Sequence, residues 1–153
     1  MTESSIPRRN IGLWLAVLGA AACTVVSIRL YAQVGLLQPL WPLPALYLLE
    51  MTALCWLGAA TLRRSAPRSA AIVCAVAGAL TGFSILGAFS IGIFYAPIAL
   101  LFAAAGALAA WRTRLPLLSA LISFAVAGIA QAALMLILLR LQPSVLILAA
   151  VPG

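Results

Sequence analysis

The sequence consists mainly of long apolar runs separated by short groups of arginine. The first run, Ile11–Ile28, follows Arg8 and Arg9 and is closed by Arg29. At about 1.5 Å per residue, a helix of this length spans about 27 Å, close to the thickness of a bilayer core. The run therefore predicts a membrane-spanning helix.

The composition of the whole chain supports this interpretation. Hydrophobic residues make up 66% of its 153 residues and charged residues only 7%, whereas a soluble domain has about 25% charged residues. A bilayer solvates apolar surface directly but requires backbone polar groups to pair with one another, as they do in helices. The runs also lack the alternating pattern of a transmembrane barrel. The sequence thus predicts an all-α, polytopic transmembrane helix bundle.

Breaks between the runs set the number of helices. The proline- and aromatic-containing segment 31–44 predicts a turn at the membrane surface, and a Gly/Ser-containing turn at 87–92 divides a stretch that is too long for one span. Pro97 is expected near the start of the helix that follows this turn, where its missing N–H costs least. We predict about five spans, at approximately residues 11–28, 45–62, 69–87, 93–111 and 116–139.

These spans form one membrane domain that covers residues 1–153. Residues 1–10 are expected to be a short basic tail, and Arg140 and Pro143 are expected to stop the fifth helix. The apolar tail 144–153 is then too short to cross the membrane. A signal peptide is the alternative interpretation of the first run, because residues 20–23 loosely resemble a cleavage site. The run is long for such a peptide, and the rest of the chain is itself apolar.

The arginines predict the orientation of the bundle. With the N-terminus in the cytoplasm, five spans place seven arginines on the inner side and two, Arg29 and Arg140, on the outer side; the seven are Arg8, Arg9, Arg63, Arg64, Arg68, Arg112 and Arg114. Such an excess on one side is typical of cytoplasmic loops. We therefore expect a multi-pass protein of the inner, cytoplasmic membrane, with its C-terminus outside. The abundance of Ala, Leu, Gly and Arg and the absence of Lys predict a bacterial source. Nucleic acid is not expected as a partner, because the arginines follow the topology of the chain.

A membrane-embedded carboxylate is the first candidate site. Glu50 lies about five residues inside the second predicted span, and Arg29 closes the first. Because consecutive helices pack antiparallel, the two side chains are expected at similar depths. The pair predicts either a structural ion pair or a proton or cation coupling site, and a third interpretation is a protonated Glu50 with a structural role.

Small and polar residues suggest two helix faces. Close packing of helices is predicted by small residues at four-residue spacing, namely Gly78, Gly82, Ala99, Ala103 and Ala107. A polar stripe on one face of the fifth helix is predicted by Ser119, Ser123 and Gln131. We expect the packing to act mainly within one chain and the stripe to supply hydrogen bonds between helices rather than a polar path.

The sequence contains no recognisable catalytic motif. It has no histidine and only two acidic residues, so most schemes of general acid–base catalysis lack their groups. Cys23, Cys55 and Cys74 lie within apolar runs without metal-ligand spacing, and neither a metal nor another cofactor is expected. We predict a non-catalytic accessory subunit or assembly partner of a membrane complex, in contact with the lipid bilayer. The alternative is a small secondary transporter that acts as a homodimer and uses Glu50 for coupling.

Overall fold

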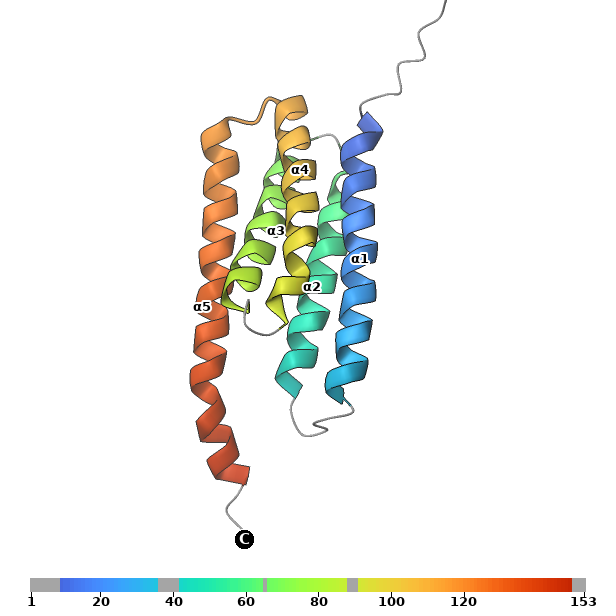
Figure 1. Cartoon of the computed structure of the whole chain (residues 1–153). Helices are drawn as coiled ribbons and strands as arrows, with labels where there is room; N and C mark the ends of the chain where they lie inside the picture. Colours follow the sequence, from blue (N-terminus) through green and yellow to red (C-terminus); the bar gives the residue numbers. More distant parts are fainter. Residues whose placement is uncertain (1–8, 36–41, 65, 88–90, 150–153) are drawn as a thin grey trace, which may run out of the picture.

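The chain folds almost entirely into helices. The computed structural model describes residues 9–35, 42–64, 66–87 and 91–149. In these ranges the elements are, in chain order, α1 (Arg9–Gly35), α2 (Pro42–Thr61), α3 (Pro67–Leu86), the 3-10 helix η1 (Gly92–Tyr95), α4 (Ala96–Thr113) and α5 (Leu117–Ala149) (Figure 1).

The lengths of the helices fit a membrane protein. Among the described residues, 4 helices are long and apolar enough to cross a membrane, and the apolar part of α2, Ala45–Thr61, is shorter. The predicted all-α bundle of about five spans is confirmed. Pro97 lies in the first turn of α4, as expected. Residues 1–8, 36–41, 65, 88–90 and 150–153 lie outside the described ranges.

The turn between the first two helices is shorter than predicted. Helix α1 continues to Gly35, so Arg29 lies within the helix instead of closing it, and α2 already begins at Pro42. A helix leaves its first N–H groups without partners inside the helix, so the prolines at positions 42 and 44 remove no helical hydrogen bond. The prolines therefore mark the start of α2 rather than a long turn.

The predicted stop of the fifth helix at residues 140–143 is wrong. Helix α5 runs to Ala149, so residues 144–149 continue the helix instead of forming a separate tail. In an apolar surrounding, backbone groups gain more from pairing within a helix than from an open chain. One missing donor at Pro143 does not end the helix. As a result, α5 extends beyond the ends of the other helices (Figure 1).

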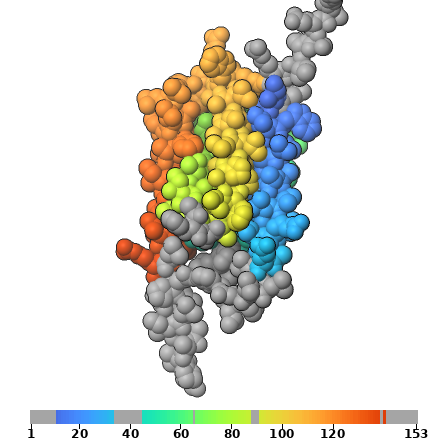
Figure 2. Space-filling view, viewed as in Figure 1, coloured from blue at the N-terminus to red at the C-terminus, as the bar shows by residue number. Residues whose placement is uncertain are grey.

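Four helices form a ring, and the fifth packs outside it. Helix α1 contacts α2 and α4, while α3 contacts α2 and α4 and so closes the ring. Helix α5 has its extensive contacts with α3 alone and forms one edge of the molecule (Figures 1 and 2). Consecutive helices alternate in direction, so their connecting segments lie at two ends of the bundle.

The centre of the ring contains an aromatic side chain placed against two glycines. Phe102 of α4 is fully buried. A Cβ atom at Gly19 of α1 or at Gly58 of α2 would lie only 2.9 Å from its ring. The ring thus fills the space that these glycines leave empty, which ties α4 to both neighbouring helices.

Helices α3 and α5 approach so closely that their backbones touch. A Cβ atom at Gly82 would lie 2.6 Å from the carbonyl oxygen of Gly128, and one at Gly78 would overlap the carbonyl group of Phe124. Small residues permit this approach, and packing of this kind holds helices together where lipid supplies no hydrophobic effect. The predicted face of Gly78 and Gly82 therefore lies against α5 of the same chain.

We expect Gly82→Ala to lower the free energy of unfolding by about 1–3 kcal/mol, because the new methyl group has no space between the two backbones. Gly12→Ala is the matched control, since its Cβ would lie 3.7 Å from the nearest atom. This control should change stability by less than about 1 kcal/mol. Unfolding by SDS titration in mixed micelles measures both values. Equal effects of the two substitutions would contradict the close α3–α5 contact.

Candidate functional site

The carboxylate of Glu50 meets an amide from the far end of the sequence. Gln131 Nε2 of α5 donates a hydrogen bond to Glu50 Oε2 of α2 at 3.4 Å. Glu50 is partly buried, and Gln131 is only 5% exposed. Because α5 otherwise packs on α3, this bond links α2 to α5 across the side of α3.

No ion pair forms between Arg29 and Glu50 in the described part of the chain. Thr52 faces α1, where its hydroxyl lies 2.9 Å from Ser27 Oγ. Successive residues of a helix are about 100° apart, so Glu50 lies about 200° around α2 from Thr52. The carboxylate therefore points away from α1, and Arg29 is exposed. The two residues were predicted to lie at a similar depth in the membrane, but their side chains do not face each other.

The predicted polar stripe on α5 is not continuous. Ser119 is exposed, and the partly buried Ser123 donates its hydroxyl hydrogen to the Ser119 carbonyl oxygen of the same helix at 2.9 Å. Among the three predicted residues, Gln131 makes a hydrogen bond to another helix. This bond is of the kind expected for the stripe, whereas the two serines contribute no bond between helices in the described residues.

The burial of the predicted alanine face on α4 differs from residue to residue. Ala99 is buried, Ala103 is partly buried against the core, and Ala107 is exposed. The close contact of α4 with α3 instead involves Gly106, where a Cβ atom would lie 3.0 Å from Cys74 Sγ. The close packing of α4 on α3 thus occurs at Gly106 rather than along the whole series of alanines.

A group of buried and half-buried hydroxyls links three elements, and no spacing in the sequence indicates this grouping. Ser27 Oγ of α1 lies 2.7 Å from Tyr95 OH of η1 and 2.9 Å from Thr52 Oγ1 of α2. Thr52 Oγ1 also lies 2.8 Å from the Leu48 carbonyl oxygen. Tyr95 is fully buried. We call Ser27, Thr52 and Tyr95 the hydroxyl cluster, and each member has a hydrogen-bond partner within the protein.

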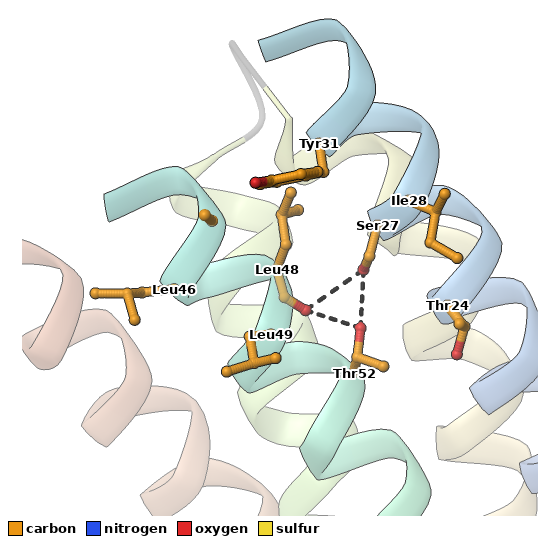
Figure 3. Close-up of a pocket in the computed structure, with 9 residues that line it drawn as sticks. Thr24, Ser27, Ile28, Tyr31, Leu46, Leu48, Leu49 and Thr52 are labelled. Carbon is orange, nitrogen blue, oxygen red and sulfur yellow. Dashed lines mark hydrogen bonds between the residues drawn. The ribbon is translucent and has the colours of Figure 1, made fainter. Parts of the chain in front are cut away.

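An open groove of about 530 Å³ lies between α1 and α2, beside the hydroxyl cluster (Figure 3). Its walls are apolar and include Ile28, Leu46 and Leu49, and its hydroxyl-bearing residues are Thr24, Ser27, Tyr31 and Thr52. The hydroxyls of Ser27 and Thr52 are already paired with each other and with the backbone. The groove can accommodate an apolar chain, but its lining provides no acid–base pair for a reaction.

The three cysteines Cys23, Cys55 and Cys74 are buried free thiols. Within the described ranges, no three His, Cys, Asp or Glu residues are placed to hold a metal ion together.

The chain matches no protein-family model, no curated protein and no solved structure. Inferences about its function therefore depend on the geometry of its own residues.

We expect Tyr95→Phe to lower the free energy of unfolding by about 1 kcal/mol, because it removes one buried hydrogen bond and keeps the ring. Tyr31→Phe is the matched control, since Tyr31 is 60% exposed. SDS titration in mixed micelles measures both variants. A loss of stability in the control as large as that in Tyr95→Phe would argue against a structural role for the hydroxyl cluster.

Proposed function

We propose that this protein is a non-catalytic subunit of a membrane complex. The partner is a transmembrane helix that docks beside α5 and brings a basic or amide side chain to Glu50. The observation that supports this proposal is the partly buried Glu50 carboxylate, which in the described part of the chain is paired with a neutral amide and with no cation.

The depth of Glu50 in α2 makes an acidic side chain costly in free energy. Glu50 lies about 7 to 8 Å from the start of the apolar segment of α2 at Ala45. An acidic side chain at the centre of a spanning helix costs about 2.5–3.5 kcal/mol on insertion scales, and less at a shallower depth. A single amide at 3.4 Å offsets only part of this cost. A donor from a second protein would offset more of it.

The exposure of α5 provides the surface for such a partner. In the span Leu117–Leu138, three residues are buried, namely Ala120, Gln131 and Met135. Its exposed large apolar residues are Leu117, Leu118, Leu121, Ile122, Val126, Ile129, Leu134, Leu136 and Ile137. Lipid can cover these side chains, but lipid tails provide no partner for a carboxylate. The combination of an apolar helix with an adjacent acid therefore favours a protein partner of complementary charge.

Photocrosslinking in the native membrane tests the proposal. Leu134 of α5 follows Gln131 by three residues, on the same side of the helix, and is 39% exposed; Leu108 of α4 is 38% exposed and serves as the matched position. We expect a photoreactive residue at 134, but not at 108, to give an adduct with a different polypeptide whose spanning segment contains a basic or amide side chain.

Glu50→Leu should reduce this adduct about tenfold or more at unchanged protein level, since a hydrogen bond to a charged group contributes about 1.5–3 kcal/mol. The proposal fails if position 134 gives no adduct, if 108 gives the same one, or if Glu50→Leu leaves it intact.

A small secondary transporter is the second candidate, and the observation in its favour is the same carboxylate–amide pair at membrane depth. A membrane carboxylate can bind either a proton or a cationic substrate. An adduct between two copies of this chain at position 134 would favour this candidate over the first.

For the transporter, we expect Glu50→Gln to abolish proton movement that is driven by organic cations in proteoliposomes with an internal pH dye. Ser123→Ala should retain it, because the Ser123 hydroxyl bonds only within its own helix among the described contacts. A wild-type protein that moves no protons with any cation tested would contradict the candidate, as would full activity of Glu50→Gln.

A further inference from the structure

A second cavity lies at the opposite end of the bundle from the α1–α2 turn. It has a volume of about 230 Å³ and is lined by residues of α1, of the α2–α3 connection, of the start of α3 and of α4. Arg64 and Arg112 are among the residues that line it, together with Ser69 and Thr113, while Leu13 and Leu62 contribute apolar walls. The cavity thus combines two arginines with an apolar surface.

The charges around this cavity are all of one sign in the described ranges. Alternating helix directions place one group of arginines at this end, namely Arg63, Arg64, Arg68, Arg112 and Arg114. The acidic residue of the described ranges, Glu50, lies on α2 toward its other end. No described carboxylate therefore neutralises the arginines that line the cavity, and the site favours an anion.

Local hydrogen bonds fix the backbone that bears these arginines. Ser69 Oγ donates to the Arg64 carbonyl oxygen at 2.6 Å, and the Ala66 N–H donates to Ser69 Oγ at 3.3 Å. Arg112 lies in the last turn of α4. This helix ends at Thr113 and is capped by Arg114, whose left-handed backbone allows the Leu115 N–H to donate to the Ala110 carbonyl oxygen at 3.0 Å. Binding an anion would thus require little ordering of the backbone.

We propose that this cavity binds the phosphate group of an anionic phospholipid. A guanidinium group matches phosphate oxygens with two parallel N–H donors, so two arginines can hold one headgroup. A lipid fits better than a free anion, because the leucine walls match the part of the lipid where the headgroup joins its acyl chains. The site also lies at a helix end, where basic pockets between spanning helices meet lipid headgroups.

Native mass spectrometry of the protein released from vesicles of phosphatidylglycerol and phosphatidylcholine tests the proposal. We expect one phosphatidylglycerol to remain bound to the wild type in preference to phosphatidylcholine. The double variant Arg64→Gln/Arg112→Gln should bind it about 30-fold more weakly, since each arginine near a lipid headgroup contributes about fivefold. If the double variant does not fold, each single variant should show its own fivefold loss.

The double variant Arg63→Gln/Arg68→Gln is the matched control. It removes the same charge at the same end, but neither residue lines the cavity. Because neither residue lines the cavity, the control removes no donor from the bound phosphate, and we expect it to weaken binding less than about threefold. An equal loss in both double variants would overturn the proposal, as would equal retention of the two lipids. Displacement of phosphatidylglycerol by excess inorganic phosphate would assign the cavity to small anions and likewise overturn the lipid proposal.

Discussion

Close backbone contact along α3 holds the molecule together, because α3 belongs to the ring of four helices and also binds α5. The contact depends on Gly78, Gly82 and Gly128, whose missing side chains let two helices touch. In lipid, helices gain little from hiding apolar surface, so packing at short range must supply the attraction. Every feature that involves α5, including the bond from Gln131 to Glu50, follows from this contact.

Two kinds of polar interaction serve different purposes in this bundle. The hydroxyls of Ser27, Thr52 and Tyr95 form hydrogen bonds with one another. The hydroxyl cluster therefore stabilises the junction of α1, α2 and η1 and needs no ligand as a hydrogen-bond partner. The Glu50 carboxylate and the arginine-lined cavity instead have capacity for further partners. They lie toward opposite ends of the helices and have opposite charge. The protein partner proposed at Glu50 and the lipid proposed at the cavity therefore bind at separate places, and either proposal can fail without the other.

The fold could be predicted from the sequence largely because a bilayer restricts a long apolar run to one structure. Span count followed from hydrophobic length, and the position of Pro97 followed from its missing N–H. The prediction for the end of α5 is wrong, because Pro143 removes a single donor, whereas lipid favours a helix in which the remaining backbone groups pair.

The candidate site was less accessible to sequence reasoning. Gln131 and Glu50 were each singled out, but their contact depends on how α5 lies against α3. The Arg29–Glu50 pair was predicted from depth alone, whereas the direction in which Glu50 leaves α2 decides its neighbour. Tyr95 joins the hydroxyl cluster through the geometry of η1, which no spacing in the sequence indicates.

The placement of α5 outside the ring also bears on the order of membrane insertion. Chains are synthesised from the N-terminus, so α1 to α4 leave the ribosome before α5. These four helices already make the contacts that close the ring, whereas one outer surface of α3 stays open until α5 arrives. During that interval, the glycines of α3 face lipid or another helix. The final step of assembly is thus a competition for this surface, and the short α4–α5 connection favours the helix from the same chain.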